Sequence, residues 1–229
     1  MEQIGFIGFY DKKDILLNIG KIYSCIGKRT LVVDATMMQR MRYIVPNVSA
    51  NHSITYVSEY EGTDVAVGFM NLGQIAQYLG TNQLNYDFII IDSDNIQTMY
   101  SFMIPSMKKI FYVTSYDKFE VEKSKELFEN INKPLQLTKV IISSNLNANE
   151  DKYLVHTLEN NLIKFDRKVE VLFEDTDRNR AATLQSQLVQ NISFKNYTST
   201  YKDSLEYLAA LIAEGMVSQS EIKSVIKKY

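Results

Sequence analysis

Residues 86–95 read Tyr-Asp-Phe-Ile-Ile-Ile-Asp-Ser-Asp-Asn and contain the most strand-like segment of the chain. Phe88–Ile91 is apolar at every position, whereas a strand with one solvated face alternates apolar and polar residues. Strands that are apolar throughout are covered on both faces, which is typical of parallel sheets. The segment ends on Asp92. We therefore expect a buried parallel strand with an acidic side chain at its carboxyl end.

Apolar runs of the same kind alternate with amphipathic stretches along the rest of the chain. The other runs expected to form strands are Ile4–Phe9, Thr30–Val33, Ile54–Val57, Asp64–Gly68, Ile110–Thr114, Val140–Ser143 and Val169–Phe173. The stretches with helical spacing are 14–26, Leu72–Leu79, Phe119–Ile131, Lys152–Phe165, Ser204–Ala213 and Ser218–Lys228. Strands separated by helices imply right-handed crossovers. The sequence therefore predicts a doubly wound α/β fold, a mostly parallel sheet with helices on both faces.

Composition favours one soluble domain in a reducing compartment. The chain has 229 residues, 45% hydrophobic residues, a net charge of −2 and a single cysteine, Cys25. No repeat or Pro/Gly-rich linker divides it, so we expect an α/β domain over 1–216 and an amphipathic helix over 217–229. No run reaches the roughly 18 apolar residues of a membrane span, and residues 1–14 lack the pattern of a signal peptide. We expect a cytoplasmic location, at most peripheral at the inner face of the membrane.

Two carboxylates follow apolar strands and mark a candidate site. Asp34 comes after Thr30–Val33, and Asp92 comes after the segment described first. Ligands of doubly wound sheets bind beyond the carboxyl ends of the strands, so the pair favours a site for a metal-bound phosphate. The alternative is that each aspartate caps its strand end or starts the next helix. The two histidines, His52 and His156, have no ligand-like spacing for another metal site.

Five segments resemble successive parts of one family, the ParA/MinD ATPases of the SIMIBI class of P-loop proteins. The run Ile-Gly-Lys-Arg-Thr-Leu-Val-Val-Asp-Ala-Thr at 26–36 resembles the end of the first βαβ unit of that family, and 86–95 resembles its second acidic strand. Segments 113–131, 173–187 and 201–212 are similar to the next strand and helix, the late loop near the nucleotide base, and the closing helix. The resemblance covers nearly the whole chain. It implies a P-loop NTPase-like fold.

The phosphate-binding loop departs from that family. The family reads Lys-Gly-Gly-x-Gly-Lys-Thr, and its glycines let backbone amides wrap the phosphates. This chain has Ile-Gly-Phe-Tyr-Asp-Lys-Lys at 7–13, and Gly8 is the one glycine left in the loop. The resemblance puts Lys12 at the position of the phosphate-binding lysine, while Lys13 replaces the hydroxyl that holds Mg²⁺. Asp11 places negative charge where a phosphate would sit, which is repulsive at short range.

Two further departures concern hydrolysis and base recognition. Family members often carry Asp-x-Asp after the second strand, but Thr36 stands in place of the later acid. In the late loop, Glu174 stands where proline is usual. If nucleotide binds, the resemblance implies that ATP contacts a set of five residues and that two acids of this set hold Mg²⁺. The set is Gly8, Lys12, Asp34, Asp92 and Asp175, and the metal ligands are Asp34 and Asp92.

The resemblance and its losses together favour a pseudo-ATPase. Such a protein would form a homodimer, or a heterodimer with an active paralogue, to position or regulate a pilus, secretion, division or partition machinery. The alternative is an active ATP hydrolase that uses its unusual loop in an ATP-dependent dimerisation switch. A third reading is an interaction domain that has lost nucleotide altogether. The cofactor is accordingly none, or ATP with Mg²⁺.

Two surfaces are candidates for partners. Methionines and arginines cluster over 37–43 and predict an adaptable protein interface, with a helix that turns two faces to core and solvent as the alternative. The C-terminal run 218–229 carries a stripe of three apolar residues, which predicts a weak membrane contact or docking onto the domain. Lys195 and Lys202 near the late loops are too sparse to favour DNA binding.

Overall fold

The computed structural model describes residues 1–47, 54–143 and 148–229, with the side chains of 148–150 left aside. Within these residues one eight-stranded sheet runs in the order β3-β4-β2-β5-β1-β6-β7-β8. Its strands are β1 (Glu2–Ile7), β2 (Thr30–Asp34), β3 (Tyr56–Tyr60), β4 (Thr63–Val67), β5 (Phe88–Ser93), β6 (Lys109–Thr114), β7 (Leu135–Ser143) and β8 (Ile163–Glu174). All neighbouring strands are parallel except β3 and β4, which form an antiparallel hairpin.

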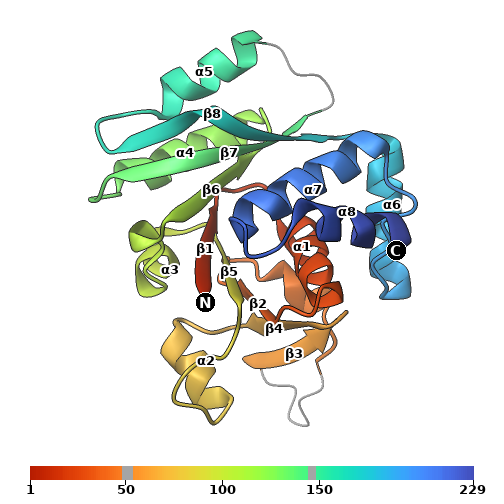
Figure 1. Cartoon of the computed structure of the whole chain (residues 1–229). Coiled ribbons are helices and arrows are strands. Elements are labelled where there is room, and N and C mark those ends of the chain that lie inside the picture. The colour runs from red at the N-terminus through yellow and green to blue at the C-terminus, as the bar shows by residue number, and fades with distance from the viewer. Residues whose placement is uncertain (48–53, 144–147) are drawn as a thin grey trace.

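Helices cover both faces of the sheet (Figure 1). They are α1 (Lys13–Cys25), α2 (Leu72–Tyr78), α3 (Ile96–Ser101), α4 (Lys118–Glu129), α5 (Ala148–Leu158), α6 (Asp177–Val189), α7 (Ser199–Ala213) and α8 (Gln219–Lys228), with short 3-10 turns η1 (Arg40–Tyr43) and η2 (Ile104–Ser106). One apolar core joins the sheet to α1, α6, α7 and α8, and the other joins it to α2, α3, α4 and α5. The predicted doubly wound α/β fold is therefore confirmed.

The all-apolar strands divide their side chains between these two cores. In β5, Phe88 and Ile90 enter the core with α1, while Ile89 and Ile91 enter the opposite core, and every residue of the strand is buried. This burial on both faces is the physical reason that the strand shows no alternation in sequence. After α1 the chain turns at Gly27, whose φ of +81° suits glycine.

The predicted helix over Lys152–Phe165 is wrong in its second half. Helix α5 ends at Leu158, and β8 already begins at Ile163, which pairs with Leu135 of β7. Between them the side chain of Asn160 accepts hydrogen bonds from the amides of Leu162 and Ile163 at 2.8 and 2.9 Å. This local turn competes with continuation of the helix, and the apolar residues after the turn belong to β8 of the sheet.

Helix α6 is an element that the sequence interpretation read as a loop. It buries small or polar side chains, Asn179, Ala182 and Ser186, on its inner face. Its large aliphatic residues point outward instead, and Leu188 is 85% exposed. A helix whose apolar residues lie outside shows no core-facing stripe, and for this reason the periodic pattern is missing from the sequence.

Helix α8 packs onto the domain through its whole apolar stripe. Ile222, Val225 and Ile226 are buried in the core that also contains α1 and α7. A capping box begins the helix: Ser218 Oγ accepts a hydrogen bond from the amide of Glu221 at 3.3 Å, and the Glu221 carboxylate accepts one from the amide of Ser218 at 2.9 Å. The stripe predicted for docking or membrane contact is thus occupied by the domain in this structure. Among the described residues, no helix combines the length and hydropathy that a bilayer crossing requires.

The last strand of the sheet contains an irregularity. Leu137 of β7 pairs with Phe165 of β8, but the next pair along joins Lys139 to Glu170, so residues 166–169 have no counterpart on β7. The side chain of Asp166 accepts the amides of Lys168 and Val169 at 2.8 and 3.2 Å within this insertion. Such a bulge bends the strand and increases its twist.

Candidate functional site

The carboxyl ends of β1, β2 and β5 bring four of the five predicted site residues together. Asp34 and Asp92 are paired in register on neighbouring strands β2 and β5. Gly8 directly follows β1, and Lys12 is the N-cap residue of α1. The fifth residue, Asp175, follows β8 and lies on the other side of the loop formed by residues 8–13. Gly8, Lys12, Asp34 and Asp92 therefore lie together at the strand ends, whereas Asp175 lies apart from them.

Lys12 is almost fully buried and directs its ammonium group at the protein itself. Its Nζ lies 2.5 Å from the carbonyl oxygen of Gly8, 3.1 Å from that of Tyr10 and 3.0 Å from Oδ1 of Asp92. Two of these contacts are hydrogen bonds to backbone carbonyls, and the third is an ion pair with the Asp92 carboxyl, whose Oδ1 has no hydrogen-bond partner among the described residues. A ligand phosphate could therefore gain a hydrogen bond from this lysine only if one of these contacts were broken.

Asp34 stabilises the turn that follows β2. Its Oδ1 accepts hydrogen bonds from the amide and hydroxyl of Thr36 at 3.2 and 2.6 Å, and its Oδ2 accepts the amide of Met41 at 2.9 Å. Burial raises the pKa of Asp34, and these hydrogen bonds partly oppose that rise. Both oxygens thus already have protein donors, which is the strand-cap role left open by the sequence.

Asp92 is a buried carboxyl held against one cation. Its side chain is 4% exposed, and burial raises its pKa to about 7, although the charge of Lys12 works in the opposite direction. The negative charge of Asp34 adds to the rise. A magnesium ion would need oxygens that are charged and free. The metal role of Asp34 and Asp92 stays a prediction, and it would require these contacts to rearrange.

The described residues contain no group of three or more histidine, cysteine or acidic side chains that could hold a metal ion. His156 lies near the end of α5, and His52 falls outside the described residues. Cys25 is the last residue of α1 and is partly exposed. The metal chemistry considered for this chain thus depends on the strand-end carboxylates alone.

The side chain of Asp11 contacts two cations, Lys13 and Arg40, and a backbone amide. Its Oδ2 accepts hydrogen bonds from Lys13 Nζ at 2.6 Å and from Arg40 Nη1 at 2.9 Å, and its Oδ1 lies 3.4 Å from the amide of Lys13. Burial raises the pKa of Asp11, but the two cations outweigh burial and hold the pKa below its ordinary value. The carboxylate is therefore ionised at neutral pH.

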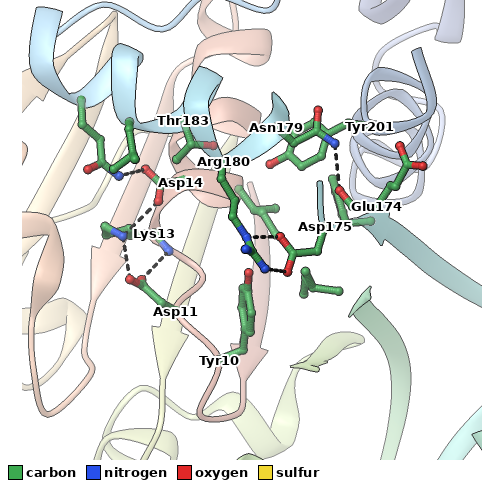
Figure 2. Close-up of a pocket in the computed structure, with 15 residues that line it drawn as sticks. Tyr10, Asp11, Lys13, Asp14, Glu174, Asp175, Asn179, Arg180, Thr183 and Tyr201 are labelled. Carbon is green, nitrogen blue, oxygen red and sulfur yellow. Dashed lines mark hydrogen bonds and ion pairs between the residues drawn. The ribbon is translucent and has the colours of Figure 1, made fainter. Parts of the chain in front are cut away.

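Two cavities of about 370 Å³ each flank the loop of residues 8–13. We call the first the strand-end cavity, which is lined by the residues around Lys12, Asp34 and Asp92 and by Arg40. The second, the β8 pocket, lies between α1, α6 and the end of β8 (Figure 2). Three loop residues line both cavities: Tyr10, Asp11 and Lys13. The loop thus forms a wall between them.

The β8 pocket has an apolar floor and a charged rim. Phe173 and Tyr201 contribute to the floor, and Figure 2 shows Tyr10 below the pair formed by Asp175 and Arg180. Asp175 Oδ1 accepts a hydrogen bond from Arg180 Nε at 2.8 Å. Asp175, the residue predicted to lie near the nucleotide base, is thus paired with a residue of the chain. Burial, followed by the charge of Asp175, raises the pKa of Tyr10 to about 12, so its phenol stays protonated. The sequence interpretation did not single out Arg180, although it lies five residues after Asp175 and its charge was the available signal.

Gly8 is required by the backbone at this position, and a substitution tests that requirement. Its φ is +119°, and an added Cβ would lie 2.3 Å from the carbonyl oxygen of Val113. We expect Gly8→Ala to lower the free energy of unfolding by about 2 kcal/mol in urea denaturation. The matched control is Gly80→Ala, where φ is +66° but nothing lies within 4 Å, and about 1 kcal/mol is expected. Equal losses in both variants would contradict a steric role for the contact with Val113.

Comparisons with known proteins concern the fold. No protein-family model matches the sequence, and no curated protein matches it. Among solved structures, a chain of the MinC:MinD cell division protein complex of Aquifex aeolicus superposes with a TM-score of 0.59 at 12% identity, over 95% of this chain and 98% of that one. A ParA family ATPase from Chlorobium tepidum gives a TM-score of 0.57 at 11% identity, over 90% and 98%.

An ATP complex of an McdA variant from Cyanothece matches in the same way. Its TM-score is 0.55 at 9% identity, over 93% of this chain and 96% of that one. The coverage is nearly complete in both directions for all three structures, so no large part of the fold is added or lost. The sheet order, the two helical layers and these superpositions agree: this chain has the P-loop NTPase-like α/β fold of the MinD and ParA ATPases.

Proposed function

We propose that this chain is a ParA/MinD-like protein with little or no ATPase activity, which dimerises to position or regulate a larger assembly. The observation that carries the proposal is that the ammonium of Lys12 donates hydrogen bonds to Gly8 and Tyr10 and forms a buried ion pair with Asp92. Removing the cation from a buried partner costs several kcal/mol. The neighbouring carboxylate of Asp11 also repels phosphate oxygens at short range. Both effects oppose the binding of a nucleotide.

The structural neighbours support a role in positioning. They include a cell division protein complex and a ParA family ATPase. The MinC:MinD complex joins two different proteins, which supports a protein partner for the present chain. Pilus, secretion, division and partition machineries are the candidate assemblies.

Exposed apolar residues at the strand-end cavity support an interface there. Met37 and Met38 are 75% and 65% exposed, and Phe119 across the same cavity is 64% exposed. Methionine side chains adapt to different partner surfaces. A second copy of the chain, or an active paralogue with the same fold, would bury these residues on binding.

An active ATP-dependent dimerisation switch is the second candidate function. It is favoured by the strand-end cavity, which gathers Lys12, Asp34 and Asp92 as a nucleotide site would, and by the ATP complex among the neighbours. In that case Lys12 would turn to the phosphates and the two carboxylates would give up their present partners for Mg²⁺. Gly8 would approach the phosphates, and Asp175 would lie toward the base.

Titration with ATP and Mg²⁺ separates the two candidates. For the wild-type chain we expect isothermal titration calorimetry to show no ATP binding with a Kd below about 1 mM. We also expect no steady release of phosphate. We also expect the same mass by light scattering with and without ATP, because dimerisation would not depend on nucleotide. Submicromolar affinity with sustained turnover, or a dimer that forms only with ATP, would establish the active switch instead.

A further inference from the structure

A carboxylate of the chain lies at the start of helix α1, where the backbone attracts negative charge. The first amides of a helix lack acceptors within the helix, and the helix dipole adds partial positive charge there. Asp11 Oδ1 lies 3.4 Å from the amide of Lys13, the first residue of α1. A helix start of this kind often binds a phosphate or sulfate, and here the anion is part of the chain.

Two cations from different segments complete the contact. Lys13 Nζ and Arg40 Nη1 lie 2.6 and 2.9 Å from the same oxygen, Asp11 Oδ2. Lys13 belongs to α1, whereas Arg40 begins the 3-10 turn η1 after β2. We call these three residues the Asp11 bridge. The bridge ties the loop after β1 to the loop after β2, the two loops that surround the strand-end cavity.

The bridge faces space rather than packed protein. Asp11, Lys13 and Arg40 all line the strand-end cavity of about 370 Å³, together with Lys12. The side chain of Arg40 is 53% exposed, so it can also reach an anion from solvent. If the negative charge of Asp11 were removed, Arg40 and the start of α1 would lose the carboxylate that they contact at this cavity, and Lys13 would keep its ion pair with Asp14.

We propose that Asp11 is a built-in substitute for a phosphate group, which closes the anion site of the strand-end cavity and holds its two loops together without nucleotide. This inference rests on the proposed function, because it explains how the arrangement persists when no nucleotide binds. In the wild-type chain, the Asp11 bridge holds the loops after β1 and β2 together whether or not a nucleotide is present. Removal of the carboxylate charge converts the same cations into a site for an added oxyanion.

Asp14 provides a matched control for this role. It lies in the same turn of α1, and its Oδ2 is 3.0 Å from Lys13 Nζ. Its other oxygen accepts a hydrogen bond from Gln187 at 2.7 Å, on the side of the β8 pocket. Asp14→Asn therefore removes one charge beside the same lysine but leaves the pairing of Asp11 with Arg40 intact.

Pyrophosphate is the probe, titrated calorimetrically into the full chain at roughly 20 mM salt so that charge screening stays small. We expect Asp11→Asn to bind pyrophosphate at least about tenfold more tightly than the wild type, equivalent to about 1.4 kcal/mol. Asp14→Asn should stay within about threefold of the wild type. Hydrogen exchange at 8–16 and 36–43 should be faster in Asp11→Asn and slow again when pyrophosphate is added.

A second variant, Arg40→Gln, keeps the proposal testable if Asp11→Asn unfolds. It should speed exchange at 36–43 without any gain in pyrophosphate affinity, because it opens the bridge but also removes a cation. Equal pyrophosphate affinity in wild type and Asp11→Asn, or an equal gain in Asp14→Asn, would overturn the inference and leave the proposed function standing. Tight ATP binding by the wild type would instead overturn the proposed function itself.

Discussion

Lys12→Met should lower the free energy of unfolding by about 3–5 kcal/mol, because it leaves the carboxyl of Asp92 buried without its cation. Lys12 Nζ lies 3.0 Å from Asp92 Oδ1, and both side chains are almost inaccessible to water. Methionine fills a similar volume, so the change removes charge and hydrogen bonds more than packing. Urea denaturation of the two proteins measures the loss.

The loss should depend on pH in a defined direction. Because burial raises the folded-state pKa of Asp92 from 3.8 to about 7, its contribution to stability is complete below about pH 4 and falls as pH rises through 7. Lys12 opposes that rise, so its removal moves the pKa of Asp92 further upward. The deficit of Lys12→Met relative to wild type should therefore be smallest near pH 5 and largest near pH 9.

The control is the double variant Lys12→Met/Asp92→Leu, which removes the buried charge as well as its partner. It should recover at least about half of the stability lost in the single variant, since replacing a buried ion pair by apolar residues is often tolerated. A single variant as stable as wild type at every pH would contradict a structural role for Lys12. The lysine would then have to be regarded as a residue kept for a ligand.

Ile222→Ala should lower the free energy of unfolding by about 3–4 kcal/mol, because Ile222 is fully buried between α8 and the rest of the domain. The deleted methyl groups lose their burial, and the cavity left behind adds to the cost. Thermal and urea unfolding both report this change. The matched control is Lys227→Gln on the exposed side of the same helix, where a change within about 0.5 kcal/mol is expected.

The same variant tests whether 218–229 is free to contact a membrane. With the stripe of α8 buried in the domain, we expect the wild-type chain to stay in the supernatant when vesicles of anionic lipid are sedimented. A negligible effect of Ile222→Ala on stability, together with sedimentation of the wild type, would show that α8 leaves the domain. The predicted membrane contact would then hold in place of docking.

Much of the fold is predictable because its strands carry their own signal. Phe88–Ile91 and the run before Asp34 are apolar throughout, and burial between two helical layers is the cause. The prediction fails where packing reverses the usual pattern, as in α6, whose inner face is made of residues such as Asn179 and Ser186. It fails again at Asn160, where one side chain decides between a longer helix and a strand.

The placement of most candidate residues is predictable from the sequence, but their contacts are not. The positions of Lys12, Asp34 and Asp92 at neighbouring strand ends follow from the topology of a parallel sheet. The ion pair of Lys12 with Asp92 cannot be predicted from the sequence alone. The same is true of the hydrogen bonds that both side-chain oxygens of Asp34 accept. Arg40 lies 29 positions from Asp11, and only the folded chain brings the two together.

The insertion at residues 166–169 also affects how molecules meet one another. β8 is the last strand in the sheet order, so its outer side is a margin at which a strand of another molecule could add. The amides of Lys168 and Val169 donate hydrogen bonds to the carboxylate of Asp166, and the pairing of β7 with β8 changes register at the same place. A foreign strand finds no straight, continuous row of partners there. A bulge of this kind disfavours the addition of a foreign strand along this edge.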